Sequence, residues 1–201
     1  MIEMTYVLVA GNNEDPCPYA WYGVQREPAP GQEYMDWVNV MDGGGAVRPE
    51  FAPRTVLRAI YEPKDYPCAQ YSPDYSYVIG GYPCVSERLR NIIESLEPGI
   101  HQLFPVDMLD ADGSTREPRR YILNVCNVAD AVISGTDLTG TGKFVVNKSN
   151  AVKIRKFAVE GLHLWIDRRV PIEKVFVSDL FYGKLVREGI GVFEALPVEE
   201  V

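Results

Sequence analysis

The sequence predicts an α+β fold with a mainly antiparallel sheet and a few helices. Short apolar runs bounded by glycine or proline outnumber stretches of helical periodicity. Strands and helices do not alternate in a βαβ rhythm, so a parallel, doubly wound sheet is not expected. The 201 residues, 46% hydrophobic and 24% charged, fit one domain with its own core. We expect a single domain over residues 1–201, with the proline- and aromatic-rich residues 1–80 as a candidate appended layer.

The first predicted strand is Tyr6–Ala10, because the apolar run YVLVA is closed by a glycine and two asparagines. Residues 13–31 contain four prolines and are predicted to be irregular. Further strands of the N-terminal third are expected at residues 35–41, 56–61 and 75–79.

The segment Ser86–Val106 predicts a capped helix that stops abruptly before a strand. The Ser86 hydroxyl can accept a hydrogen bond from a free amide of the first turn, and Glu87 places negative charge at the positive end of the helix. One apolar stripe follows at helical spacing, formed by Leu89, Ile92, Ile93 and Leu96. Pro98 and Gly99 end the helix, and residues 103–109 are predicted to be the strand.

The C-terminal half predicts several strands and a second helix. A turn at residues 110–113 leads into a strong strand at 121–128. Ser178 is expected to cap a helix over residues 180–188, which Gly189 ends. The other predicted strands are 143–147, 162–166, 174–177 and 192–196. Beyond them, the carboxylates of Glu199 and Glu200 are expected to lie in a solvated, mobile tail.

The net charge of −8 and the isoelectric point of about 4.9 limit the classes of partner. Nucleic acid and anionic membranes attract basic faces, so neither is an expected partner, whereas a basic protein is compatible. Four dispersed cysteines without a CxxC pair predict free thiols in a reducing compartment. The first residues lack the pattern of a signal peptide, and no apolar run is long enough to span a membrane. We expect a cytoplasmic protein.

The search for catalytic and ligand motifs identifies none. Residues 135–144 lack the first glycine and the final hydroxyl of a phosphate-binding loop, and residues 110–121 lack the glycine and glutamate positions of a calcium loop. His101 and His163 form no HExxH pair, and no GxSxG elbow occurs. The cysteines lie beside proline or in apolar strands, where a buried thiol is the default. We therefore predict no catalytic residue, no metal and no cofactor.

One segment favours a binding surface. Aromatic rings with charged neighbours are typical of protein interfaces. The alternative is that these rings pack the N-terminal layer onto the sheet. The candidate partner-binding residues are Trp21, Tyr22, Glu33, Tyr34, Asp36 and Trp37.

The run SERLRNIIESLEPGIHQLFPVDML, followed by RYILNV at residues 120–125, resembles the immunity protein 11 family of bacterial polymorphic toxin systems. Similarity continues through residues 163–165, 176–179 and 189–193, so it covers residues 85–194. The resemblance implies a non-enzymatic antitoxin of bacterial competition. Such a protein is cytoplasmic and occludes a cognate toxin or effector domain, delivered by contact-dependent or type VI-like secretion. The motifs mark positions of the fold and carry over no functional residue.

Two other classes of function stay open, as does the oligomeric state. A small enzyme that reverses the modification made by a toxin would protect at sub-stoichiometric amounts, and a pocket with convergent titratable groups would favour it. A regulatory binding module would have no toxin, and the neighbouring genes would identify it.

Overall fold

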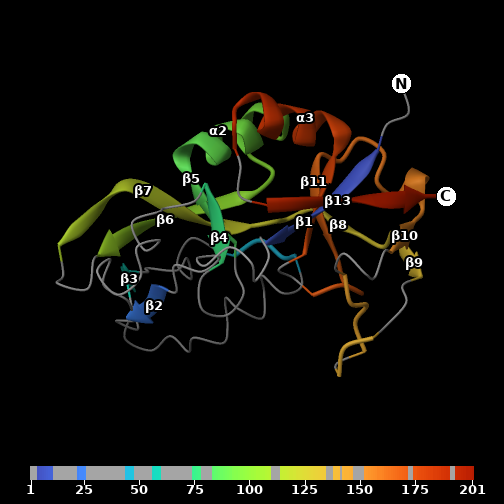
Figure 1. The fold of residues 1–201 in the computed structure, drawn as a ribbon, viewed down its shortest axis with the longest axis horizontal. Helices are drawn as coiled ribbons and strands as arrows, with labels where there is room; N and C mark the ends of the chain where they lie inside the picture. The colour runs from blue at the N-terminus through green and yellow to red at the C-terminus, as the bar shows by residue number, and fades with distance from the viewer. Residues whose placement is uncertain are drawn as a thin grey trace.

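The computed structural model describes residues 4–10, 22–25, 44–47, 56–59, 74–77, 83–109, 114–134, 138–140, 142–146, 152–171, 174–190 and 193–201. In these residues the chain forms two sheets, with the helices α2 (Glu87–Leu96) and α3 (Asp179–Arg187) side by side over one face (Figure 1). Most strand pairs are antiparallel, which confirms the predicted α+β class. The predicted strand at residues 35–41 lies outside the described residues.

The seven-stranded sheet has the order β8-β11-β12-β1-β13-β10-β9. Its strands are β1 (Thr5–Ala10), β8 (Val128–Ala129), β9 (Val132–Ser134), β10 (Lys153–Ile154), β11 (Leu164–Asp167), β12 (Val175–Ser178) and β13 (Phe193–Glu200). Two neighbouring pairs, β8 with β11 and β10 with β13, are parallel, and the rest are antiparallel. β1 lies in the middle, where Thr5 is opposite Ser178 on one side and Val198 on the other.

The six-stranded sheet has the order β2-β3-β6-β7-β5-β4. Its strands are β2 (Tyr22–Gln25), β3 (Val56–Ala59), β4 (Tyr75–Tyr77), β5 (Pro83–Ser86), β6 (Gln102–Leu109) and β7 (Thr115–Asn124). Only β3 and β6 pair in parallel among these strands. The N-terminal third therefore supplies strands to both sheets. The prediction that residues 13–31 are irregular is wrong at β2, which forms by pairing with β3 more than 30 residues later.

The seven-stranded sheet curls, because its two edge strands β8 and β9 are separated only by Asp130 and Ala131. The junction between β8 and β9 is called the seam below. Asp167, which is 2% exposed, holds this seam. Its Oδ2 accepts from the amides of Ala131 (2.8 Å) and Val132 (2.7 Å), and its Oδ1 accepts from the amide of Arg169 (2.8 Å). Three donors satisfy the buried carboxylate, which makes the seam a specific joint rather than an apolar contact.

Two apolar cores lie on opposite faces of this sheet. One contains Trp165 and Phe176, which stack with ring centroids 5.9 Å apart. The other packs α2 and α3 onto the sheet through buried side chains such as Leu89 and Phe181. Each such side chain contributes roughly 1.5–3 kcal/mol when it leaves water. The two cores thus cover both faces of the seven-stranded sheet, so a surface site can form at the ends of its strands.

Both predicted helices are confirmed with their caps. The hydroxyl of Ser86 accepts from the amide of Leu89, and that of Ser178 accepts from the amide of Phe181, each at 3.2 Å. Beyond the two C-termini, Gly99 has a φ of +69° and Gly189 a φ of +63°, a left-handed conformation that favours glycine. Local sequence alone determines these boundaries.

Two predictions were wrong in the C-terminal half. In the described part of 143–147 no strand forms, since Phe144 makes one isolated bridge and its amide donates to the carbonyl of Arg169 (2.7 Å). Glu199 and Glu200 do not form a mobile tail. They belong to β13, which pairs on both sides, and their carboxylates face Lys153 (2.6 Å) and Lys156 (3.7 Å). Contacts with residues far away in sequence decide both cases.

Candidate functional site

The residues predicted to bind a partner are not tested by the structure. Trp21, Glu33, Tyr34, Asp36 and Trp37 lie outside the described residues. Tyr22 begins β2, but its side chain is outside them as well. This aromatic and acidic segment stays a prediction.

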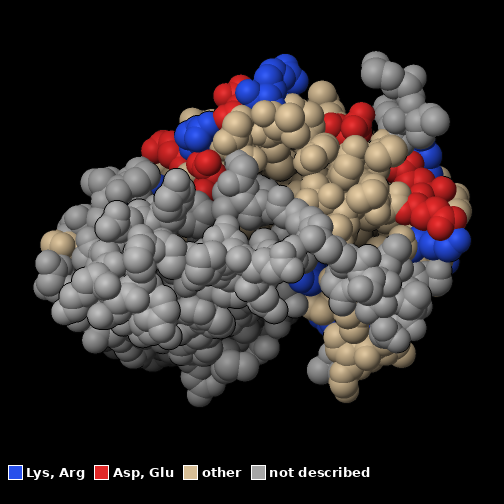
Figure 2. Space-filling view, viewed as in Figure 1, with Lys and Arg blue, Asp and Glu red and all other residues tan. Residues whose placement is uncertain are grey.

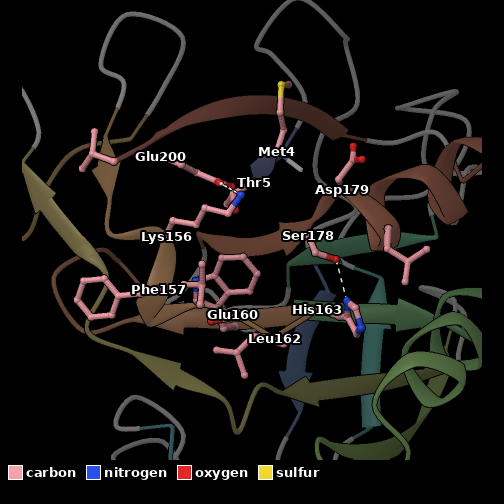
Figure 3. A pocket seen from close by; sticks show the side chains of 15 residues that line it. Met4, Thr5, Lys156, Phe157, Glu160, Leu162, His163, Ser178, Asp179 and Glu200 are labelled. Carbon is pink, nitrogen blue, oxygen red and sulfur yellow. Dashed lines mark hydrogen bonds and ion pairs between the residues drawn. The ribbon is translucent and has the colours of Figure 1, made fainter. Parts of the chain in front are cut away.

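A groove opens at the end of the curled sheet where β1 and β11 begin and where β12 and β13 end (Figure 3). The 3-10 turn η3 (Lys156–Ala158) forms another wall. The cavity volume is about 990 Å³, within the range of protein ligand sites. Four segments that are distant in sequence meet here, so no single motif could reveal the groove.

The groove is unusually rich in exposed apolar side chains. Seven large apolar residues are exposed in the described part of the chain, and four of them line the groove. Phe157 is 75% exposed, which is the highest value of the seven. Contiguous exposed apolar surface with a polar rim marks sites of interaction. The four residues are Met4, Phe157, Leu180 and Val201.

Backbone hydrogen bonds hold Phe157 in its exposed position. The amide of Arg155 donates to the carbonyl of Ala131 (2.9 Å), and the amide of Lys156 donates to the carbonyl of Val201 (3.1 Å). Two residues further on, Val159 is buried in the core of the curled sheet. The turn is therefore fastened on both sides of the aromatic ring, which points away from the core.

The rim of the groove is predominantly acidic. Of the described residues, Glu160, Asp179 and Glu200 line it with carboxylates and Lys156 with one ammonium, which lies 3.7 Å from the Glu200 carboxylate. Figure 2 shows acidic side chains around the C-terminal end of β13, with basic ones beside them. Burial, followed by the negative charge of Asp179, raises the pKa of the Tyr6 hydroxyl, which donates a hydrogen bond to that carboxylate. Asp179 is therefore held in place at the rim.

Behind the groove lies a buried polar network centred on Glu97. Its Oε2 is 2.7 Å from Nε2 of His101, and its Oε1 accepts from the side-chain amide of Asn127 and the backbone amide of His163, both at 2.9 Å. Burial alone would raise the pKa of the carboxyl, but the hydrogen bonds from His101 and His163 outweigh it and lower the pKa. The network joins α2 to both sheets.

The hydrogen bonds of this network have a structural role and leave none of its described groups free for proton transfer. The amide of Cys126 donates to Nδ1 of His101 (3.2 Å), so Nε2 carries the proton that Glu97 accepts. Both ring nitrogens are therefore occupied. Burial raises the pKa of the Cys126 thiol, more than a hydrogen bond with the Gln102 backbone lowers it, which disfavours the reactive thiolate. A Cys–His nucleophile is not supported here.

One polar pair does reach the groove. Nδ1 of His163 is 2.9 Å from the hydroxyl oxygen of Ser178 (Figure 3). The same oxygen caps α3 by accepting from the amide of Phe181. Within the described residues no carboxylate is hydrogen-bonded to the His163 ring to orient it as the base of a triad, since Glu97 accepts from the backbone amide of His163 instead. No group of three or more metal-ligating side chains occurs in that part of the chain, and no helix described there is long and apolar enough to cross a membrane.

Comparison with known proteins identifies the family. The sequence profile of the Immunity protein family (Imm11) matches residues 10–199, a wider span than the resemblance at residues 85–194. The match includes both helices, the Glu97 network, most of the groove lining and every described strand except β1, of which it contains only Ala10; it stops one residue before the end of β13. No curated protein matches the chain. The chain therefore belongs to the Immunity protein family (Imm11).

Proposed function

We propose that this protein neutralises a cognate bacterial toxin by stoichiometric binding in the cytoplasm of the cell that makes it. The toxin domain would arrive from a competing cell by contact-dependent or type VI-like secretion. Membership of an immunity protein family supports this role. The observation that carries the binding mechanism is Phe157, a ring 75% exposed on a fastened turn beside an open apolar groove. Such anchors dominate the energy of protein interfaces.

A catalytic role is the second candidate, since the Ser178 hydroxyl contacts His163 at the groove. Binding is favoured because the Ser178 oxygen is already a helix cap and the described residues supply no carboxylate to the imidazole. Ser178→Asn separates the two functions. Asparagine retains a capping oxygen but removes the nucleophilic hydroxyl, so protection should persist if the protein acts by binding and disappear if Ser178 is catalytic.

The proposal is tested by co-expression with the toxin domain encoded beside this gene. Growth should recover in proportion to the amount of immunity protein and should saturate when the two proteins are equimolar. Calorimetry on the purified pair should give a one-to-one complex. Full protection at a small fraction of the toxin concentration would overturn binding in favour of catalysis. Absence of both protection and complex would overturn the immunity role for that toxin.

A further inference from the structure

We propose that the groove binds a segment of the toxin in which lysine or arginine side chains adjoin aromatic or aliphatic ones. This inference rests on the proposed function and specifies the partner chemistry of its site. The apolar walls and the acidic rim of the groove, both formed by described residues, determine that chemistry. A segment that is both basic and apolar satisfies both features at once, whereas the rim repels an acidic segment and a purely polar segment leaves the apolar side chains uncovered.

The apolar part of the site comes from three walls. Phe157 belongs to η3, Leu180 belongs to the first turn of α3, and Met4 is the residue before β1. They are 75%, 51% and 38% exposed, respectively. Covering them would remove apolar area from water, which contributes roughly 25 cal/mol per Å² before the costs of association. An apolar side chain of the toxin segment is expected to lie against Phe157.

The charged part of the site selects for cations. Among the described residues that line the rim, three carboxylates and one ammonium leave an excess of two negative charges, from Glu160, Asp179, Glu200 and Lys156. Glu160 is exposed and projects beside the turn that carries Phe157. The net charge of −8 adds a long-range attraction to basic partners. Such attraction raises the association rate, and like charge repels acidic competitors.

A second cavity in the described residues gives the opposite chemistry. It has a volume of about 430 Å³ between α2 and α3, and Arg88, Lys184 and Arg187 line it. The lining includes none of the exposed large apolar residues. A basic segment would be repelled by these three cations. Matched control positions lie on and just after α3, outside the lining of the groove. Val186 is 62% exposed on the last turns of α3, and Glu188 is exposed at its C-terminus.

The site is already formed, which favours tight binding. The β1, β12 and β13 backbones are held in the sheet, and η3 is tied to both the seam and β13 through backbone hydrogen bonds. Little ordering is then required when a segment enters, so less of the interaction energy is lost on association. The toxin segment, rather than the groove, is expected to adapt.

The test selects phage-displayed random dodecapeptides on the immobilised full-length chain and measures the enriched peptides by calorimetry. Enriched sequences should combine lysine or arginine with aromatic or aliphatic residues. Phe157→Asp should weaken their binding about 30-fold or more, as expected for an interface anchor. Glu160→Lys should weaken it about 5-fold, with the difference shrinking at high salt. The controls Val186→Asp and Glu188→Lys should stay within about 2-fold of the wild type.

A second substitution keeps the test decisive if the Phe157→Asp variant does not fold. Leu180→Asp removes another apolar wall, while an acidic residue in the first turn of α3 favours the helix. It should also weaken peptide binding, by about 10-fold. The inference is overturned if the enriched peptides are acidic, if no peptide depends on Phe157 or Leu180, or if the control variants weaken binding equally. Because co-expression tests the immunity role separately, protection without these effects would reject the groove and keep the proposed function.

Discussion

Glu97 and His101 share a buried hydrogen bond of 2.7 Å that joins the C-terminus of α2 to the start of β6. The other oxygen of the Glu97 carboxylate accepts from Asn127, before β8, and from His163, before β11. One carboxylate thus connects four segments and both sheets. We expect the relative position of the sheets, and with it the groove, to depend on this residue.

Glu97→Gln should lower the free energy of unfolding by about 2–4 kcal/mol. The glutamine oxygen can still accept from Asn127 and His163, but its amide group then faces the Nε2–H of His101, so two donors oppose each other. Urea denaturation measures the effect. The control is Glu94→Gln on the same helix, whose carboxylate accepts from the Gly99 amide in an exposed contact. Its cost should stay within about 0.5 kcal/mol, and equal costs for both variants would contradict the role of the network.

The same carboxyl predicts a pH dependence. Hydrogen bonds from His101 and His163 outweigh the opposing effect of burial and lower the folded-state pKa of Glu97. A lowered pKa stabilises the fold fully above the unfolded-state pKa of about 4.3, and this contribution is lost as the pH falls through the folded-state value. The difference in unfolding free energy between wild type and Glu97→Gln should be constant from about pH 7 to 5.5 and shrink below about pH 4. A difference that grows in acid would refute this assignment.

The seam of the seven-stranded sheet predicts unequal roles for two aspartates. Asp167→Asn should cost about 2–4 kcal/mol, since the new amide group cannot accept from the buried backbone amides that the carboxylate satisfies. Asp130 also contacts Arg169 (2.6 Å), but its side chain is 88% exposed. Asp130→Asn should therefore cost less than about 1 kcal/mol. Thermal unfolding of the two variants measures the contrast, and similar melting temperatures would show that the seam is not specifically held.

Two glycines should respond to alanine in opposite directions. Gly44 has a φ of +68°, and a Cβ there would lie 1.9 Å from Cγ2 of Val128. Gly44→Ala should lower stability by at least about 2 kcal/mol, through both strain and overlap. Gly183 lies inside α3, where an added Cβ meets no atom within 4 Å. Gly183→Ala should raise stability by about 0.5–1 kcal/mol. The melting temperatures of both variants, each compared with the wild type, test these opposite effects. A stabilised Gly44→Ala variant would mean that this backbone can relax.

Local elements could be predicted from the sequence, whereas elements made by distant partners could not. The helices at residues 87–96 and 179–187 follow from a serine cap, an apolar stripe and a glycine after the end. β7 starts at Thr115, six residues earlier than the sequence indicated, because the polar run TREPRR becomes a strand only by pairing with β6. The acidic end of β13 is extended for the same reason.

The candidate site illustrates the same limit. Phe157 stands in a short turn without periodicity, and nothing beside it in sequence indicates that its ring stays exposed. Only the meeting of Met4, Leu180 and Val201 with that ring creates the groove. Glu97 and His101 are close in sequence, but the Pro98-Gly99 break between them removes the helical spacing that would have paired them. The predicted aromatic segment at residues 21–37 awaits its own test.

The position of β1 has a consequence for how the protein is made. Among the described strands β1 is synthesised first, whereas its two neighbours, β12 and β13, are synthesised last. At about 5–20 residues per second, its apolar YVLVA edge waits roughly ten seconds or more for partners. During that time it is exposed to wrong pairing with other nascent chains. The seven-stranded sheet therefore forms only after β12 and β13 have been synthesised, and the groove, whose walls include both Met4 and Val201, forms with it.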